Sequence, residues 1–382
     1  MEIVYVSKTC DEKSFSRLYD LSLFPLEQQA QKFNSLIIKG LSLNEVKVRC
    51  ISSIPVSKFK MKRRRFKLEN IEDGNSSFFY LTYHENRIIK LASNFITTFV
   101  KAMSMKKDDV LICDSLCITI AFAALLAAKI KRMRSVAIVT DLPMFISKGI
   151  TSRINKFIIN RYDSYIVMTK YMMDKLPKKP YLVMEGICDV DITLPKEKVK
   201  AKSNVCLYTG GVYEKYGIKT LIDAFELIGD KLELNIYGNG DYVEQIRKRS
   251  LPNVKYCGTL LNKEIILKQQ EAAVLINPRP TTEEFSKYSF PSKILEYMLS
   301  GTPTVTTKMQ GMPIEYYPFL YLLDKEDKKS IAEVLLNVVN EEDSNIKGLN
   351  AKKYVISNKN CIIQAKNILA FVYGMKGDSI NV

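Results

Sequence analysis

The chain has 382 residues, of which 47% are hydrophobic and 26% charged, and its formal net charge is +16. This length exceeds one ordinary domain and the apolar content excludes a disordered chain, so we expect two folded domains. The positive charge favours acidic partners, whether nucleotide phosphates, nucleic acid or an anionic membrane surface, without choosing among them.

The eight cysteines are scattered through the chain and form no Cys-x-x-Cys pair. This pattern favours reduced thiols in a cytoplasmic protein over a zinc site or a disulfide framework. Residues 1–6 begin directly with a strand pattern, without the basic leader and apolar region of a signal peptide. The longest apolar run, residues 118–128, is shorter than the roughly 20 residues that a membrane-spanning helix needs.

Strand and helix patterns alternate through the first half of the chain, which is typical of parallel sheets covered by helices. The predicted strands are residues 3–6, 46–51, 110–113, 135–140, 164–168 and 181–184. The predicted helices are residues 28–43, 87–103, 117–131 and 148–161.

A basic run with interleaved apolar residues occupies residues 58–67 and includes Lys62, Arg63, Arg64 and Arg65. Such a run can rest on anionic lipid headgroups, to which each cation contributes about 1 kcal/mol. A solvated loop explains it equally well. Nucleic acid is not expected as a partner, because no recognised nucleic-acid module surrounds the run.

The single histidine and an Asp-x-Asp pattern are interpreted as structural features and not as parts of a catalytic or metal site. His84 is the only histidine and follows an aromatic strand pattern, so we expect it to have a structural role. Asp189 and Asp191 form the Asp-x-Asp pattern of many metal sites, but they lie at the expected hinge between domains. We interpret them as a loop feature and predict no metal site.

A polar, lysine-rich stretch at residues 195–203 is interpreted as a linker. A second series of strands begins at residue 205 and continues at residues 232–237, 254–257, 273–277, 304–306 and 320–323. These patterns predict one domain at residues 1–195 and another at residues 203–358. A C-terminal helix and tail, residues 359–382, are expected to return to the first domain.

Glycine-rich turns follow two strands of the second series. Gly210 and Gly211 end the first strand, and Gly238 and Gly240 end the next one. Glycine lets a phosphate approach the backbone closely, and Lys215 can neutralise its charge. Either turn alone is equally well explained as a tight turn, but turns at the carboxyl ends of parallel strands converge on one edge of a sheet.

Residues 283–303 place helix-start chemistry beside a cation and a carboxylate. Pro291 suits the opening of a helix, and Ser292 can cap its free N–H groups. A helix N-terminus that follows a strand attracts anions, to which Lys293 adds a positive charge. Glu296 can accept hydrogen bonds from hydroxyl groups. An ordinary capped helix with solvated charges explains this segment alone equally well.

The order of these motifs resembles the donor domain of family 4 (group 1) glycosyltransferases, and in particular the bacterial members that assemble capsules or exopolysaccharides. The motifs are Thr-Gly-Gly before Lys215, Ile-Tyr-Gly-Asn-Gly, Ile-Asn-Pro-Arg279, and Ser-Phe-Pro-Ser-Lys293-Ile-Leu-Glu296. The resemblance is strong over residues 205 to about 318 and looser in the first domain. It implies an α/β protein of the GT-B fold, with two Rossmann-like domains whose parallel sheets face a central cleft.

The resemblance also implies roles for residues of the predicted site. Lys215 and Lys293 would contact the diphosphate of a nucleotide sugar and act in catalysis, while Glu296 would hold the ribose hydroxyls. The remaining residues that would bind the donor are Gly210, Gly211, Gly238, Gly240 and Ser292. Two lysines and a helix dipole can stabilise a leaving diphosphate, so neither a metal nor a cofactor is expected.

Asp141 follows a predicted strand of the first domain, where it could orient hydroxyls of the acceptor or sugar and so serve as a catalytic residue. The preference of aspartate for N-cap positions favours a capping role beside Pro143 instead. Both interpretations remain open at this point.

The chain departs from the family pattern at three positions. Many members carry a glutamate at the position of Tyr288, an arginine at that of Gly211 and a histidine near that of Thr140. Glu283 or Glu284 could replace the missing carboxylate, although a solvated loop is the favoured explanation for both. In the family, the leaving phosphate is thought to accept the proton of the acceptor, so the absence of a protein base does not exclude transfer.

The resemblance therefore predicts a glycosyltransferase that moves a sugar from a nucleotide-sugar donor to a growing, lipid-linked, cell-surface glycan. Transfer is expected to be retaining and metal-independent, at the inner face of the plasma membrane. The alternatives are a non-catalytic partner subunit of a glycan-assembly complex and a nucleotide-sugar epimerase.

Overall fold

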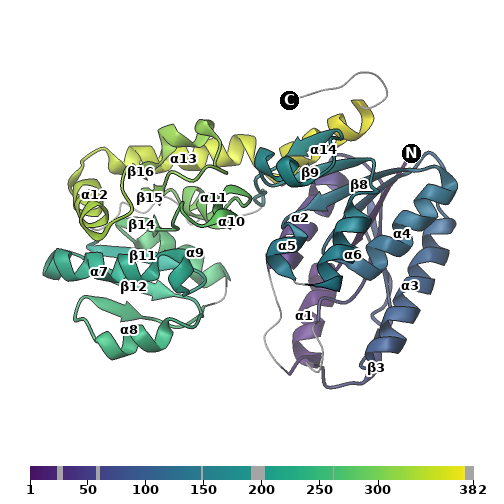
Figure 1. The fold of residues 1–382 in the computed structure, drawn as a ribbon, viewed down its shortest axis with the longest axis horizontal. Coiled ribbons are helices and arrows are strands. Elements are labelled where there is room, and N and C mark those ends of the chain that lie inside the picture. Colours follow the sequence, from purple (N-terminus) through teal and green to yellow (C-terminus); the bar gives the residue numbers. More distant parts are fainter. Residues whose placement is uncertain (24–28, 57–60, 148, 191–202, 261, 375–382) are drawn as a thin grey trace. The chain divides into compact units, whose positions relative to one another are not determined.

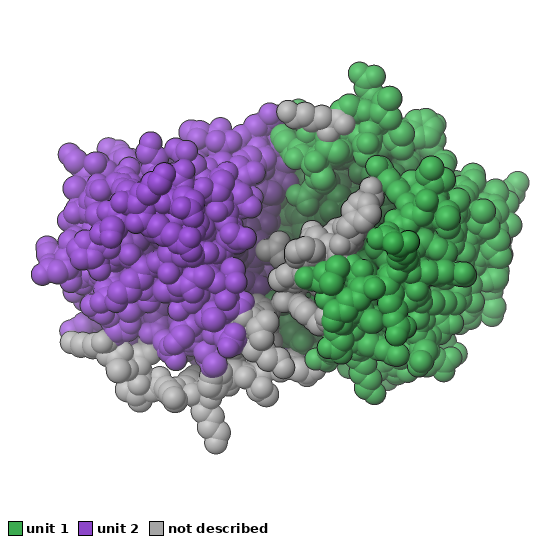
Figure 2. All heavy atoms as spheres, turned by 90° about the horizontal axis from the view of Figure 1, so that it is seen from below, with its two compact units in different colours: residues 1–189, 360–382 green, residues 190–359 purple. Residues whose placement is uncertain are grey.

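The computed structural model describes residues 1–382 except 24–28, 57–60, 148, 191–202, 261 and 375–382. The chain divides into two compact units, shown in separate colours in Figure 2. Unit 1 contains residues 1–189 and 360–382, and unit 2 contains residues 190–359. Most of the predicted linker, residues 195–203, lies outside the described residues.

Unit 1 is built on an eight-stranded sheet with the order β10-β9-β8-β7-β1-β2-β5-β4 (Figure 1). Its strands are β1 (Ile3–Ser7), β2 (Val48–Ser52), β4 (Ile71–Asp73), β5 (Ser76–Tyr80), β7 (Val110–Asp114), β8 (Arg134–Val139), β9 (Ser164–Val167) and β10 (Tyr181–Val183). Every pairing is parallel except that of the edge strand β4 with β5. Parallel strands covered on both faces need apolar side chains on both, and all five residues of β1 are buried.

The helices of unit 1 cover this sheet. They are α1 (Glu12–Leu21), α2 (Gln29–Leu43), α3 (Arg87–Met103), α4 (Ile118–Lys131), α5 (Pro143–Ile146), α6 (Ile150–Ile159) and α14 (Cys361–Gly374). A short antiparallel pair, β3 (Arg65–Phe66) with β6 (Tyr83–His84), stands apart from the main sheet. All four helices expected in this half of the chain are present within a few residues of their predicted ends, whereas α1 was not expected.

The last helix, α14, packs against α2 in unit 1. A methyl group at Gly40 of α2 would lie 2.1 Å from the backbone oxygen of Cys361, so the two helices touch through their backbones at this point. The Asn44 side chain donates a hydrogen bond to the Ile362 carbonyl (3.0 Å), and the Arg134 guanidinium donates one to the Val372 carbonyl (2.9 Å). These contacts fix residues 361–374 to the N-terminal part of the chain.

Unit 2 contains a six-stranded, wholly parallel sheet with the order β13-β12-β11-β14-β15-β16. Its strands are β11 (Val205–Thr209), β12 (Glu233–Tyr237), β13 (Val254–Tyr256), β14 (Val274–Asn277), β15 (Thr304–Thr307) and β16 (Tyr321–Leu323). Its helices are α7 (Ile218–Ile228), α8 (Val243–Arg249), α9 (Asn262–Glu271), α10 (Glu284–Lys287), α11 (Ser292–Ser300), α12 (Lys328–Asn340) and α13 (Ser344–Asn358).

The strand order of unit 2 reverses between β11 and β14, which is the doubly wound arrangement of a Rossmann-like sheet. Unit 1 has the same arrangement, because its order reverses between β1 and β7. The predicted α/β class with parallel sheets is confirmed in both units. Ligands of such sheets bind at the carboxyl ends of strands, next to the reversal.

Close packing of α14 on α2 predicts that Gly40→Ala destabilises the protein. Alanine is the better helix former by about 1 kcal/mol, but its methyl group would meet the Cys361 carbonyl and push α14 outward. We expect a net loss of about 1–3 kcal/mol in the free energy of unfolding, measured by urea denaturation. Thr151→Ala, at an exposed site in α6, is the matched control and should leave stability unchanged or slightly higher. Equal stability of Gly40→Ala and the wild type would contradict this account of the helix contact.

Candidate functional site

The glycine loops of unit 2 lie side by side at the carboxyl edge of its sheet. Gly210 N–H donates to the Tyr237 carbonyl (2.7 Å), which joins the end of β11 to the end of β12. Val212 N–H donates to the Asn239 carbonyl (2.9 Å), and Gly238 N–H donates to that of Gly258 after β13 (2.7 Å). Three successive strand ends are therefore tied together by backbone hydrogen bonds.

Backbone packing alone requires glycine in the second loop. A methyl group at Gly238 would lie 1.7 Å from the Gly210 carbonyl oxygen, and one at Gly240 would lie 2.0 Å from that of Val212. Gly238 also has a φ of +142°, which side chains rarely adopt. The Gly-x-Gly pattern at this turn is thus explained without a ligand.

Gly210 has a different neighbour. A methyl group there would lie 1.0 Å from Lys293 Nζ and 2.0 Å from Lys293 Cε. The missing side chain of Gly210 leaves the space that the lysine amine fills. Gly210 of the first glycine loop and Lys293 of α11, which were predicted separately as site residues, are therefore in contact.

Helix α11 holds Lys293 in this position through a tyrosine one turn further along. The Tyr297 hydroxyl is fully buried and accepts a hydrogen bond from Thr209 N–H at the end of β11 (2.9 Å). Gln269 of α9 donates to the Thr209 hydroxyl from another side (3.4 Å). These bonds fix the register of α11 against the strand that precedes Gly210.

The start of α11 corrects one expectation. The N-cap is Pro291 and has no side-chain capping bond, while Ser292 is the first helical residue and is exposed. The predicted capping role of Ser292 is wrong, since a residue already inside the helix does not accept from the first N–H groups. The N-cap residue itself provides no capping side chain, so the positive end of the helix dipole can attract an anion there.

The pKa of Lys293 is lowered to about 8, mainly because burial disfavours the charged amine; the opposite charge of Glu296 opposes this shift, and the charge of Arg279 adds to it. The amine lies 5.0 Å from the centroid of the Tyr208 ring, which partly offsets the loss of water around the cation. At neutral pH most molecules still carry the charge. An anion bound beside Lys293 would stabilise the protonated form.

Two more cations meet around a pair of aromatic rings next to the first glycine loop. Lys215 Nζ lies 5.3 Å from the Tyr216 ring and 5.9 Å from that of Phe285. The Arg279 guanidinium lies 5.0 Å from Tyr216 and 4.8 Å from Phe285, and it donates to the Ser289 hydroxyl (3.2 Å). Arg279 had no role in the sequence-based prediction, although its place two residues after β14 is a signal for this edge.

The carboxylates of residues 283–296 have different surroundings. Glu296 is half-buried, and its charge acts on Lys293. Glu283 and Glu284 lie exposed at the start of α10, whereas Tyr288 is buried, with 6% of its surface exposed. A buried phenol thus occupies the position where the family resemblance implies a carboxylate.

The Asp141 side chain lies exposed in unit 1, two residues after the end of β8. The N-cap of α5 is Leu142 and has no side-chain capping bond, so the capping role favoured for Asp141 is wrong. Its role as a catalytic residue stays a prediction. A more buried carboxylate at this edge, Asp114 at the end of β7, was not predicted.

Asp114 belongs to a polar chain inside unit 1. Tyr5 donates from its hydroxyl to Asn34 Oδ1 (2.6 Å), and Asn34 Nδ2 donates to Asp114 Oδ2 (3.2 Å). Burial raises the pKa of Asp114, while hydrogen bonds from Leu116 and Asn34 oppose this effect. An acidic residue directly after the predicted strand 110–113 was the available signal in the sequence.

The other singled-out residues of unit 1 lie elsewhere. His84 of β6 pairs with Arg65 of β3; partial burial and the charge of Arg65 lower the pKa of His84, in keeping with a structural role. Asp189 accepts a hydrogen bond from Lys39 of α2 (2.7 Å), and Asp191 lies outside the described residues.

Part of the basic run, residues 58–60, also lies outside the described residues; in the remainder the five cations are exposed, whereas Met61 is buried and Phe66 is half-buried. Lys62 donates to the Asp20 carbonyl (2.7 Å), and Arg64 pairs with Glu85 at 3.4 Å. Across the described part of the chain, no group of three or more histidine, cysteine, aspartate or glutamate residues is placed to hold a metal ion.

Residues 203–341, which include the whole candidate site of unit 2, match the family model for glycosyl transferases group 1. No curated protein sequence matches the chain. The fold is similar to that of Anabaena HepE solved with UDP, at 13% identity and a TM-score of 0.67, with 98% of this chain and 100% of that chain covered.

Two other solved structures are similar over nearly the whole chain. Staphylococcus aureus TarM, solved with fondaparinux, α-GlcNAc-glycerol and UDP, has 12% identity and a TM-score of 0.66, with 97% and 99% covered. The lipopolysaccharide outer core galactosyltransferase WaaB has 14% identity and a TM-score of 0.64, with 98% and 100% covered. The predicted GT-B fold is confirmed by these likenesses.

The buried amine of Lys293 predicts that Lys293→Met stabilises the protein at neutral pH. The Lys293 amine binds its proton less tightly in the folded state than in the unfolded state. The free energy of unfolding of the wild type therefore rises with pH between about 8 and 10.5. We expect the variant to be about 1–3 kcal/mol more stable at pH 7, and this advantage to shrink across that window.

Urea denaturation of both proteins at several pH values measures the difference. Lys231→Met, which removes an exposed lysine of unit 2, controls for the loss of one charge. A constant difference between Lys293→Met and the wild type at all pH values would rule out a buried, protonated amine.

Proposed function

Because residues 203–341 match glycosyl transferases group 1, we propose that the protein is a glycosyltransferase that takes its sugar from a nucleotide-sugar donor bound in unit 2. The observation that carries this proposal is the Lys293 amine, held in the space left by Gly210 beside the open start of α11. A cation, a helix N-terminus and a glycine loop together favour the diphosphate of such a donor.

The chemistry of transfer fits this arrangement. The bond between the sugar and the diphosphate breaks with growing negative charge on the diphosphate, and fixed positive charges lower the energy of that state. We assign this role to Lys293 and Lys215, and add Arg279, which shares the aromatic pair Tyr216 and Phe285 with Lys215. The acceptor hydroxyl oxygen forms a bond to the anomeric carbon on the face from which the diphosphate leaves, and the leaving phosphate takes the hydroxyl proton. Transfer by this route is metal-independent and retains the configuration of the sugar.

Glu296 is assigned to the ribose hydroxyls of the donor. It follows Lys293 by nearly one helical turn, so both side chains project from neighbouring positions of α11. A half-buried carboxylate that accepts hydrogen bonds from two hydroxyls would hold the nucleoside while the lysines hold its phosphates.

The acceptor we propose is a lipid-linked, cell-surface glycan at the inner face of the plasma membrane. The net charge of +16 and the exposed cations Lys62, Arg63, Arg64 and Arg65 in unit 1 support an anionic membrane surface as a partner. Asp141, exposed after β8, is proposed to orient acceptor hydroxyls.

The second candidate is a non-catalytic partner subunit of a glycan-assembly complex. It is favoured by Tyr288, whose buried ring replaces the carboxylate expected from the family resemblance. Both candidates bind nucleoside diphosphates, so only turnover distinguishes them. Transfer assayed across the common nucleotide sugars, with lipid-linked acceptors, is the deciding measurement. Tight diphosphate binding without any turnover would favour the partner subunit, and conversion of donor without acceptor would indicate an epimerase.

The assigned roles predict different losses for two substitutions in α11. Lys293→Ala should lower kcat about 10²–10³-fold, because it removes a charge that acts on the leaving group. Glu296→Ala should weaken donor binding about tenfold or more, through lost hydrogen bonds to a charged group. Initial rates at varied donor concentration separate the two effects. Lys329→Ala and Glu333→Ala, at exposed positions of α12, are the matched controls. Wild-type kinetics in both α11 variants would refute this site.

A further inference from the structure

One side of unit 1, formed by α3, α4, α5 and α6, exposes many large apolar side chains. We call it the apolar face, and Figure 1 shows α3, α4 and α6 side by side on unit 1. The residues exposed by 39% or more are Ile88, Ile89, Leu91, Ile96 and Val100 of α3, Leu126 and Ile130 of α4, Met144, Phe145 and Ile146 of α5, and Ile150, Ile154 and Phe157 of α6. Scattered exposed apolar residues are ordinary, but neighbouring helices that all expose them mark a binding surface.

Helix α3 exposes its apolar side and buries polar residues, whereas an amphipathic helix at the surface of a protein in water does the reverse. Its residues Ile88, Ile96 and Val100 are 78%, 61% and 62% exposed, whereas Asn94 and Thr98 are buried. Asn94 Oδ1 and Thr98 Oγ1 have no hydrogen-bond partner within the described residues. A helix normally turns its apolar side inward, so this exposed side needs an apolar environment of its own.

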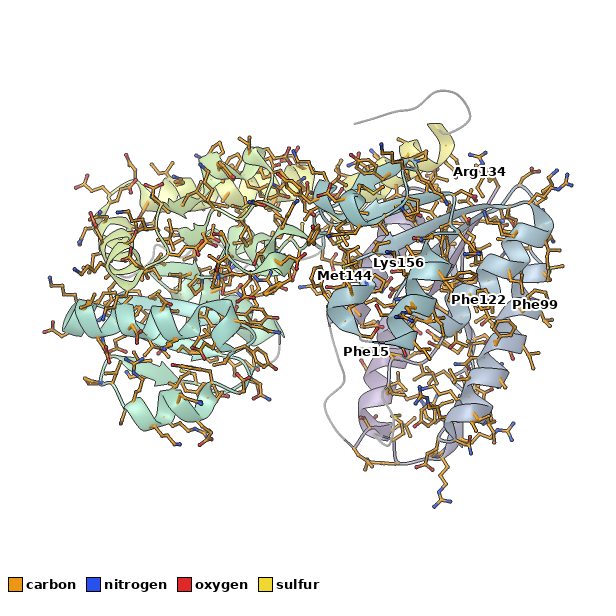
Figure 3. The ribbon with its side chains drawn as sticks, in the orientation of Figure 1. Phe15, Phe99, Phe122, Arg134, Met144 and Lys156 are labelled. Carbon is orange, nitrogen blue, oxygen red and sulfur yellow. The ribbon has the colours of Figure 1, made fainter. Side chains whose placement is uncertain are left out.

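Helix α6 buries Ile158 and Ile159 on its inner side, but it also exposes large apolar residues on its outer side. Ile150 and Phe157 are 73% and 50% exposed, whereas Asn155 is buried and its Oδ1 has no partner among the described residues. Between α4 and α6 lies a hollow of about 470 Å³ lined by Phe122, Leu125, Leu126 and Phe157, together with Lys129 and Arg161. Figure 3 labels Phe122 of α4, Phe99 of α3 and Met144 of α5 on these helices.

The charged residues within the four helices all have one sign. The four helices contain three basic residues in α3, two in α4 and two in α6, and their sequences contain no aspartate or glutamate. Arg87, Lys129, Arg153 and Lys156 are exposed, whereas Lys90, Lys101 and Lys131 are half-buried and contact the Tyr83 ring, the Phe79 ring and the Met105 carbonyl.

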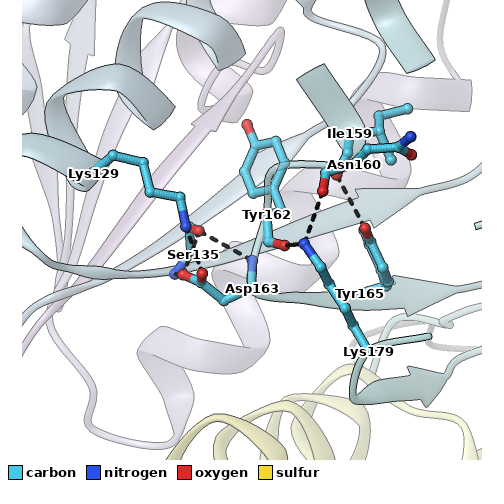
Figure 4. Close-up of polar contacts among 8 residues, drawn as sticks. All are labelled: Lys129, Ser135, Ile159, Asn160, Tyr162, Asp163, Tyr165 and Lys179. Carbon is cyan, nitrogen blue, oxygen red and sulfur yellow. Dashed lines mark hydrogen bonds and ion pairs between the residues drawn. The ribbon is translucent and has the colours of Figure 1, made fainter. Parts of the chain in front are cut away.

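The neighbouring carboxylate of Asp163 already has partners. It accepts hydrogen bonds from Lys129 (2.5 Å) and from the amide and hydroxyl of Ser135 (2.9 and 2.7 Å; Figure 4). The carboxylate beside the N-terminus of α3, Glu85, pairs with Arg64. Both of these carboxylates are therefore engaged, whereas Asp141, two residues before α5, is exposed at the edge of the face.

This combination selects one occupant. A second copy bound through the same face would place basic side chains against basic side chains, which is repulsive. Anionic lipid instead offers phosphate groups to the cations and acyl chains to the isoleucines and phenylalanines. No helix within the described residues is both long and apolar enough to cross a membrane.

We propose that the apolar face binds the surface of an anionic lipid membrane, with its exposed apolar side chains entering the boundary between headgroups and acyl chains. The inference deepens the membrane contact in the proposed function and rests on it, but moves the main contact from Lys62–Arg65 to α3–α6. Lipid binding is measured without any nucleotide sugar, so either proposal can fail alone.

The test is co-sedimentation of the full chain with vesicles of phosphatidylcholine and phosphatidylglycerol, and with vesicles of phosphatidylcholine alone. The wild type should bind the anionic vesicles more tightly. The triple variant Ile88→Ser, Ile96→Ser, Ile154→Ser should bind at least about tenfold more weakly, because it removes apolar surface that enters the lipid. These side chains are exposed, so folding should be intact, as circular dichroism and thermal unfolding can check.

The matched control is Leu227→Ser, Leu267→Ser, Ile314→Ser, which removes exposed apolar residues of unit 2 and should bind as the wild type does. A charge pair distinguishes the two basic surfaces. Arg153→Glu with Lys156→Glu should lower binding more than Arg63→Glu with Arg64→Glu.

Several results would overturn the inference. They are failure of the wild type to bind anionic vesicles, unchanged binding by the α3–α6 triple variant, and a larger loss from the Arg63 and Arg64 pair. Conversion of a wild-type dimer to a monomer by the triple variant, seen in sedimentation, would assign the face to a second copy instead. Donor binding by the triple variant should equal that of the wild type, which keeps the test separate from the proposed function.

Discussion

The hydrogen bond between the Tyr297 hydroxyl and the Thr209 amide joins helix α11, which holds Lys293 and Glu296, to the strand that ends at the first glycine loop. Thr209 ends β11, a central strand next to the reversal of strand order, and Tyr297 lies inside α11, a helix from the other half of the sheet. Because the bond is buried, breaking it would leave polar groups without water or partner, at a cost of about 1–3 kcal/mol. It fixes the rotation of α11, and that rotation directs Lys293 toward Gly210.

The position of Lys293 is unfavourable to folding and favourable to anion binding for the same reason. Burial removes water from the amine and lowers its pKa to about 8, so the folded chain holds a cation at a cost in stability. An arriving diphosphate would meet a charge that is already desolvated and oriented, and it would not need to reorganise the site. Tyr208 beneath the amine and Glu296 beside it reduce this cost without neutralising the site.

The features predictable from the sequence were those set by local pattern. Buried parallel strands such as β1 and β11 are short apolar runs, α3 has helical spacing, and α4 is an apolar run long enough for a helix, so their positions followed directly. Pairings distant in the chain were beyond such reasoning. Arg279 and Lys215 are joined by aromatic rings at residues 216 and 285, and no spacing rule connects these positions. The capping roles of Ser292 and Asp141 failed because a single residue of shift in a helix start changes which side chain can cap.

The exposed apolar side of α3 could not be predicted from the spacing of apolar residues in the sequence. The apolar stripe of Ile88, Ile96 and Val100 indicates an amphipathic helix, but the pattern does not state whether the stripe meets the core or the surroundings. The structure places it outward and buries Asn94 and Thr98, whose Oδ1 and Oγ1 atoms have no hydrogen-bond partner in the part of the chain that the structure describes; each such oxygen disfavours folding in water. Such locally unfavourable choices persist where another requirement outweighs them. The buried amine of Lys293 in unit 2 and the exposed isoleucines of α3 in unit 1 are therefore evidence of the same kind, the first for an anionic ligand and the second for an apolar, anionic surface.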